Sequence, residues 1–210
     1  MKAEYILHSG GDDLVVDAAR VSMDKVAANY TPEQNAKLIK YLATHNHFTP
    51  FTHSQITLRL TVPIFVARQE FKHVIGFTRN EVSRRYVDDE PMFHTPKIWG
   101  ARPEKSIKQG SGGAHPDSDR YSEFYDGLIT HAMALYDEMI DDGVAPEMAR
   151  MCLPQSMMTS YYLTGSLQAF ARLYKLRVDP NAQLEIQELA AMIGDIIEPL
   201  YPVSWEALTV

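Results

Sequence analysis

Cysteine is almost absent from this chain of 210 residues. Cys152 stands alone, so no disulfide can form within the chain and no cluster of thiolates can bind a metal ion. No apolar run approaches the length of a membrane span, and the first residues lack the apolar core of a signal peptide. We therefore expect a cytoplasmic protein with no membrane partner.

Positive charge is also scarce. Lys and Arg number 20 against 27 Asp and Glu, which gives a formal net charge of -7. Proteins that bind DNA or RNA normally carry a broad excess of positive charge, so we expect no nucleic-acid partner. The composition is 45% hydrophobic and 22% charged, which is typical of a globular protein, and we expect one domain over residues 1–210.

Several motifs that carry chemistry are missing. The sequence has no glycine-rich loop that would cradle phosphates and no Gly-x-Ser-x-Gly nucleophile turn. His45, His47, His53 and His73 lack the carboxylate partner and the helical spacing of a metal site, so we predict no bound metal. Cys152 lies in an apolar run, which favours a small buried residue over a nucleophile.

Hydrophobic periodicity predicts an α+β fold. Residues 54–62 alternate between apolar and polar side chains, as a half-buried strand does, and residues 4–8 form a second short strand. Helices are predicted at residues 14–21, 31–44, 63–72, 121–142, 146–150, 156–174 and from 180 onward. We expect a small, mostly antiparallel sheet packed against several long helices.

The clearest helix start is at Thr31, which is followed by Pro32 and by Gln34 to complete a capping box. Residues 84–93 are expected to be extended. Residues 95–120 form a long predicted loop with a glycine-rich centre, and a loop of this length in a compact domain is either a functional lid or disordered. We treat it as a mobile loop.

The segment 63–86 contains the densest group of cations in this acidic chain. Its charged residues are Arg68, Lys72, Arg79, Arg84 and Arg85, with His73, Glu70 and Glu81. A solvated helix face explains any one of them. The group as a whole favours a site for a small molecule that carries phosphate, because guanidinium groups bind phosphate oxygens through two parallel hydrogen bonds.

Arg177 lies just before a predicted helix start. Its side chain either points into a cleft or forms a capping ion pair with Asp179, and the sequence favours neither arrangement over the other.

Seven short segments follow one another along the chain: 18–22 (AARVS), 47–53 (HFTPFTH), 63–69 (PIFVARQ), 80–86 (NEVSRRY), 149–154 (ARMCLP), 164–166 (TGS) and 176–185 (LRVDPNAQLE). As an ordered set they resemble the flavin-dependent thymidylate synthase family. That family's central motif reads Arg-His-Arg, two residues, Ser, one residue, Asn-Glu. Here the spacing between Lys72-His73-Val74 and Asn80-Glu81 is one residue longer than in the family motif. Lys72 stands in place of the first arginine of that motif, so a point charge replaces a bidentate donor.

The resemblance implies an enzyme that methylates 2'-deoxyuridine 5'-monophosphate (dUMP) to thymidylate (dTMP). 5,10-Methylenetetrahydrofolate would supply the carbon, and FAD reduced by NADPH would supply the hydride. The cofactor, not a protein nucleophile, would then do the difficult chemistry. The family is homotetrameric with sites shared between subunits, so the resemblance implies a homotetramer.

The roles of individual residues follow from the same resemblance. Arg177 would be the catalytic residue, because it would hold the uracil carbonyl and favour ionisation of the ring nitrogen. The dUMP site would consist of Gln69, Lys72, Glu81, Ser83, Arg84, Arg85, Arg150 and Arg177. The FAD site would consist of Ser22, His47, Thr49, Lys72, His73, Val74, Glu81, Ser166 and Arg172.

Two other interpretations are weighed beside this one. The first is a different nucleotide-binding flavoenzyme. The second is a non-catalytic module that binds nucleotides or RNA through residues 68–85. The acidic balance of the chain and its lack of an aromatic stacking platform count against the second.

Overall fold

A four-stranded sheet forms the centre of the protein. The computed structural model describes residues 1–86, 90–103 and 110–210. Within them the strands are β1 (Lys2–His8), β2 (Gln55–Pro63), β3 (Phe77–Glu81) and β4 (Met158–Ser166). Their order in the sheet is β1-β2-β4-β3, and every neighbouring pair is antiparallel. The predicted α+β fold with a small antiparallel sheet is therefore confirmed.

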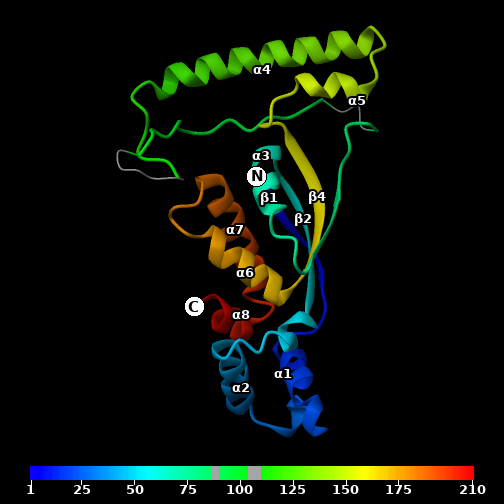
Figure 1. Cartoon of the computed structure of the whole chain (residues 1–210), viewed down its shortest axis with the longest axis vertical. Helices are drawn as coiled ribbons and strands as arrows, with labels where there is room; N and C mark the ends of the chain where they lie inside the picture. The colour runs from blue at the N-terminus through cyan, green and yellow to red at the C-terminus, as the bar shows by residue number, and fades with distance from the viewer. Residues whose placement is uncertain (87–89, 104–109) are drawn as a thin grey trace.

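The helices surround this sheet unevenly. In the described residues they are α1 (Asp12–Arg20), α2 (Pro32–Thr44), α3 (Ile64–Glu70), α4 (Ser118–Asp141), α5 (Pro146–Ala149), α6 (Leu167–Arg177), α7 (Leu184–Ile197) and α8 (Pro202–Thr209). α6 and α7 lie beside the sheet, whereas α1, α2 and α8 gather at one end of the molecule (Figure 1). The long α4 crosses the other end, next to α5 (Figure 1).

The hydrophobic core lies between the sheet and its covering helices. Ile56, Leu58, Leu60 and Val62 of β2 are all fully buried, and the residues between them are not. They belong to one cluster with Leu167, Phe170 and Leu173 of α6 and Ile186, Leu189, Ile193 and Ile197 of α7. The alternation predicted for residues 54–62 therefore selects the face of the sheet that is buried.

The start of α2 has the predicted capping box. Thr31 Oγ1 accepts from the Gln34 main-chain N–H at 3.3 Å, and Gln34 Oε1 accepts from the Thr31 N–H at 3.0 Å. Pro32 occupies the first turn, where its missing N–H costs nothing.

The helix predicted over residues 156–174 is wrong in its first half. The chain forms β4 up to Ser166, and α6 begins at Leu167. In β4 the buried residues Thr159, Tyr161 and Leu163 alternate with more exposed neighbours, which is the period of a strand. A helical assignment of this apolar run overlooks its threonine and tyrosine residues, which pack well on a pleated sheet.

Three further boundaries differ from the prediction. β3 follows Gly76, in a stretch for which the sequence pattern predicts no strand. The segment 84–93, expected to be extended, contains a turn at residues 84–86, while residues 87–89 lie outside the described part of the chain. The last predicted helix is two helices: α7 begins after Gln183 and not at residue 180, and α8 follows at Pro202.

The predicted loop 95–120 is irregular up to residue 117 where it is described. It contains an isolated bridge between Gly100 and Ala114, and its last residues belong to α4. Residues 104–109, at the centre of that prediction, lie outside the described part of the chain. Among the described helices none has the length and apolarity that a membrane span requires.

Removing a core side chain from β2 tests this arrangement. Leu58 is fully buried, so Leu58→Ala should lower the free energy of unfolding by about 2–5 kcal/mol because it leaves a cavity. Leu7→Ala on β1 is the matched control, since Leu7 is 52% exposed and its loss should cost less than about 0.5 kcal/mol. Urea denaturation of both variants gives the comparison, and equal losses would contradict the assigned core.

Candidate functional site

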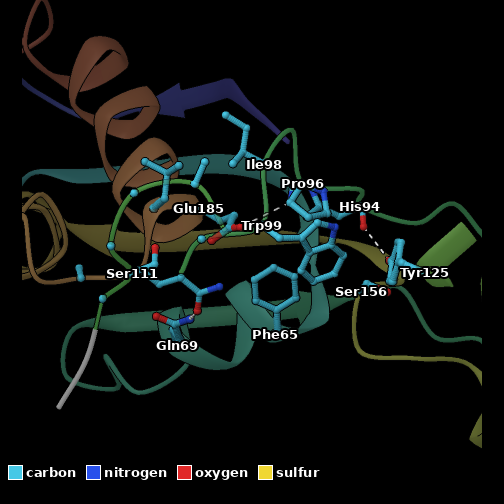
Figure 2. A pocket seen from close by; sticks show the side chains of 18 of the residues that line it. Phe65, Gln69, His94, Pro96, Ile98, Trp99, Ser111, Tyr125, Ser156 and Glu185 are labelled. Atoms are coloured by element: carbon cyan, nitrogen blue, oxygen red, sulfur yellow. Dashed lines mark hydrogen bonds and ion pairs between the residues drawn. The ribbon is translucent and has the colours of Figure 1, made fainter. Parts of the chain in front are cut away.

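The principal pocket has a volume of about 840 Å³ and lies where α3, the start of α7 and the segment after β3 converge. Its lining comprises Phe65, Gln69, His94, Pro96, Ile98, Trp99, Gly100, Gly110, Ser111, Gly112, Gly113, Ala114, Tyr125, Ser156, Arg177, Ala182, Gln183, Leu184 and Glu185. Figure 2 shows Trp99 and Phe65 on one side of this space and Glu185 on another. The lining thus combines aromatic rings with a few polar groups, which is typical of a site for a small organic molecule.

Hydrogen bonds from α4 fix the aromatic wall. Trp99 Nε1 donates to Ser122 Oγ at 3.1 Å, and the Tyr125 hydroxyl donates to the main-chain oxygen of His94 at 2.7 Å. His94 Nε2 lies 3.7 Å from Glu185 Oε1, too far for a hydrogen bond, and it has no hydrogen-bond partner within the described residues. The buried Nε2 of His94 therefore faces the Glu185 carboxylate without a hydrogen bond.

Among the described residues that line the pocket, Arg177 is the only arginine or lysine. As the last residue of α6, it donates from Nε to His73 Nε2 at 2.9 Å and from Nη2 to the main-chain oxygen of Gln69 at 3.0 Å. Asp179 accepts instead from the N–H and the side-chain amide of Asn181. Of the two arrangements that the sequence leaves open, the structure therefore has the one in which Arg177 points into a cleft.

The partner of Arg177 is a neutral imidazole. Partial burial and the charges of Arg177, Arg172 and Arg79 lower the pKa of His73 to about 4. A guanidinium can only donate, so His73 Nε2 must be the acceptor and the ring proton must be on Nδ1. His73 thus links the turn after α3 to the end of α6.

Another, smaller pocket of about 340 Å³ lies between α1, α2 and the turn at Thr49–Thr52. Ser22, His47 and Thr49, which were predicted together from separate motifs, all line it. Asn46 and Phe48 complete its polar and aromatic lining. The polar side chains offer hydrogen-bond donors and acceptors to a ligand in this pocket.

Other predicted residues lie away from the principal pocket. Ser83 accepts from Arg85 Nε at 3.2 Å in the turn after β3, and the Arg85 guanidinium lies over the Tyr86 ring. Arg150 is exposed and donates to the main-chain oxygen of Glu147. Arg84 is half-buried in the same turn as Arg85. Within the described chain, none of the predicted dUMP residues except Gln69 and Arg177 lines the principal pocket.

The remaining predicted residues surround the turn between α3 and β3. Lys72 and Val74 are exposed in that turn, and Arg172 is exposed on α6. Glu81 accepts from the Thr159 hydroxyl at 2.6 Å, so β4 fixes its carboxylate. Ser166 caps α6, because its Oγ accepts from the Ala169 N–H.

The surroundings of Cys152, which is partly buried, disfavour a thiolate. Burial raises the pKa of the Cys152 thiol, and its Sγ lies 3.1 Å from the main-chain oxygen of Ala149 as a donor. Among the described residues there is no group of His, Cys, Asp and Glu that could hold a metal ion.

Several lining residues are not predicted from the sequence. His94 flanks the predicted loop, Trp99 lies in it, and Tyr125 belongs to the helix after it. Only the concentration of aromatic residues there indicates a wall. Gln183 has a clearer signal because it lies in the segment 176–185. Its side chain accepts from Gln69 Nε2 at 2.8 Å.

The antiparallel sheet, the helices beside it and the arginine-bearing pocket make this an α+β protein with a pocket suited to a polar small molecule. Residues 4–203 match the family described as Thymidylate synthase complementing protein. The chain therefore belongs to the flavin-dependent thymidylate synthase family, as its relatives also indicate.

Two such relatives carry the name flavin-dependent thymidylate synthase. That of Thermosipho africanus is 37% identical over 202 residues, covering 94% of this chain and 86% of the relative. That of Thermus thermophilus is 35% identical over 198 residues, covering 94% of this chain and 72% of the relative. The solved UMP/dUMP methylase PolB of Streptomyces cacaoi, bound with 5-Br dUMP, superimposes with a TM-score of 0.89 at 29% identity, covering 99% of this chain and 94% of PolB.

The neutral state of His73 predicts a dependence of stability on pH. The unfolded chain binds a proton at this ring near pH 6.5, whereas the folded protein resists it down to about pH 4. The free energy of unfolding should therefore fall as the pH drops from 6.5 to 4.

Urea denaturation at several pH values measures this dependence, which His73→Gln should weaken because glutamine does not titrate. His131→Gln on α4 is the control and should keep the wild-type dependence. The His131 ring is hydrogen-bonded through Nδ1 to the main-chain oxygen of Gly127 in the same helix. Identical pH profiles for wild type and His73→Gln would refute the assignment.

Proposed function

We propose that this protein methylates dUMP to dTMP, with 5,10-methylenetetrahydrofolate as the carbon donor and FAD reduced by NADPH as the source of the hydride. The observation that carries the proposal is Arg177, whose guanidinium is held in the pocket by the His73 ring and the Gln69 main-chain oxygen. The names of the relatives support the reaction, and PolB supports a uracil nucleotide as the substrate.

Arg177 would act on the uracil ring as a fixed positive charge. Two of its N–H groups are already used to hold it, so the remaining ones are available to a ligand. A guanidinium beside a uracil carbonyl oxygen stabilises the negative charge that develops when the ring nitrogen loses its proton. Because the group is oriented before the substrate binds, little reorganisation is needed during the reaction.

Recognition of the nucleotide phosphate would fall to the basic residues outside the pocket. Ser83, Arg84 and Arg85 share one turn, and Arg150 lies on the surface near α5. A phosphate monoester is bound well by arginine forks. These residues lie outside the lining of the principal pocket of the same chain, which supports a site completed by a neighbouring subunit.

A flavin cofactor fits the residues around the smaller pocket. Ser22, His47 and Thr49 supply polar groups there. Lys72 and Arg172 are exposed outside the lining of that pocket, and they would supply positive charge for a diphosphate. When bound, the reduced flavin would supply the hydride. The chain's own contribution is to bind and orient the reactants and to hold the charge of Arg177 in place.

A homotetramer would cover the apolar surface of α4. Tyr121, Phe124, Leu128 and Leu135 are 43–63% exposed and recur at the spacing of one helix face. Exposed apolar patches of this kind mark interaction sites. We propose that α4 packs against a second copy of this chain and so brings the separated parts of the site together.

The function can be tested on the purified protein. It should take up FAD and show an oxidised flavin spectrum that NADPH bleaches, and with dUMP and methylenetetrahydrofolate it should form dTMP. UMP is assayed in parallel, because PolB is a UMP/dUMP methylase. Arg177→Ala should lower kcat/KM about 10²- to 10³-fold, as the loss of one charge-stabilising donor does.

Lys175→Ala is the matched control for that variant. Lys175 lies on the same helix but donates to the main-chain oxygen of Val210, so its loss should leave turnover unchanged. A colourless protein that binds no added FAD would refute the flavin chemistry. Full turnover by Arg177→Ala would refute the catalytic role of that residue.

Light scattering tests the assembly. The wild type should have the mass of four chains, and Phe124→Glu with Leu128→Glu should dissociate it, because charges would enter a desolvated interface. Thr130→Glu is the control, since Thr130 lies on the opposite side of α4 from that apolar stripe. A wild-type monomer would contradict the proposal.

A further inference from the structure

A buried ion pair lies directly behind the turn that carries His73. Glu70, the last residue of α3, is 0% exposed, and the Arg79 side chain on β3 is 15% exposed. Arg79 Nε donates to Glu70 Oε2 at 2.9 Å, and Arg79 Nη2 donates to Glu70 Oε1 at 2.6 Å. The pair is therefore the bidentate fork that gives the strongest charge-assisted hydrogen bonds.

Arg79 also binds the main chain of the turn. Its Nη2 donates to the main-chain oxygen of Glu70 at 3.3 Å and to that of His73. The rings of Phe71 and Phe77 lie 5.3 and 5.2 Å from its guanidinium carbon. One side chain thus holds two carbonyl oxygens of the turn while two aromatic rings confine it.

The far end of the turn is also fixed. Gly76 has a φ of +80°, in the region that favours glycine, and an added Cβ would lie 2.9 Å from the Ala169 Cβ. Its main-chain oxygen accepts from the Ser166 N–H at 3.2 Å. With Arg79 holding its middle and α6 holding its end, the turn has little freedom to move.

We propose that Arg79 is a positioning residue: by holding the main-chain oxygens of Glu70 and His73, it keeps the His73 ring where it accepts the hydrogen bond from Arg177. The main chain of His73 is bound by one arginine and its ring by another. Arg79 lies outside the lining of the principal pocket, so it acts on the site through His73. The catalytic consequence rests on the function proposed above, whereas the positional one does not.

The pKa of His73 reports on the position of its ring, because burial and neighbouring charges set that pKa. Arg177 and Arg172 act on it from α6 and Arg79 from β3, while Glu70 of α3 is paired with Arg79. If the turn is released, the ring moves toward water and away from Arg177, and its pKa should return toward 6.5. A loss of stability alone would not produce this shift. Because the Arg79 charge itself lowers the His73 pKa, the deciding variant is the one that keeps a positive charge at position 79.

The deciding experiment is an NMR titration of the histidine rings in the 210-residue chain, with His73→Gln used to assign the signal. Two variants are compared with the wild type. Arg79→Lys keeps a positive charge that can pair with Glu70. Its single ammonium group cannot also reach the main-chain oxygens of Glu70 and His73. The double variant Glu70→Met with Arg79→Met removes both buried charges, a change that often leaves stability intact.

In the folded variants the His73 pKa should rise from about 4 toward 6.5, and kcat at neutral pH should fall about 10- to 100-fold, as small misplacements of a catalytic group cause. Arg59→Lys, on β2, is the control and should change neither quantity. A His73 pKa that stays near 4 in either folded variant would overturn the proposal. So would failure of both variants to fold, because the pair would then serve folding and not position.

The titration also separates this proposal from the proposed function. If the wild type forms no dTMP, the function is wrong, yet the His73 pKa in the variants still decides the role of Arg79.

Discussion

The antiparallel pairing of β2 with β4 is the constraint on which the rest of the structure depends. Pro63 at the end of β2 lies opposite Met158 at the start of β4, and Gln55 lies opposite Ser166. The helices that follow the two strands, α3 and α6, therefore start at opposite ends of the sheet. α6 then runs back along the sheet and brings its last residue, Arg177, to the end of α3, where Gln69 and His73 receive it.

The charge around His73 is opposite in sign to the net charge of the whole molecule. The chain is acidic, with a net charge of -7, yet three arginines surround His73 and hold its ring neutral. Each positive charge close to a partly buried imidazole disfavours its protonation. A neutral ring can accept from Arg177, whereas a protonated one would repel it. The local excess of positive charge therefore orients the catalytic candidate as well as suiting an anionic substrate.

The cation cluster in residues 63–86 illustrates how far the site is predictable. Its density predicts a site for a small molecule that carries phosphate, and this stays a prediction. The pattern does not reveal that Arg79 is paired with the buried Glu70, nor that Arg85 lies over the Tyr86 ring away from the principal pocket. Partners of a long side chain depend on neighbours that are distant in sequence, and composition alone contains no information about them.

The sequence by itself determined the local features of this protein. The alternation in β2 and the capping box at Thr31 depend only on residues close together in the chain. The ordered motifs that indicate the family extend along most of the chain, but they can be read without any tertiary contact. The tertiary structure alone decided that residues 158–166 form a strand and that Arg177 points into the pocket. Both outcomes need a partner from elsewhere, since β4 requires β2 beside it and Arg177 requires the turn that carries His73.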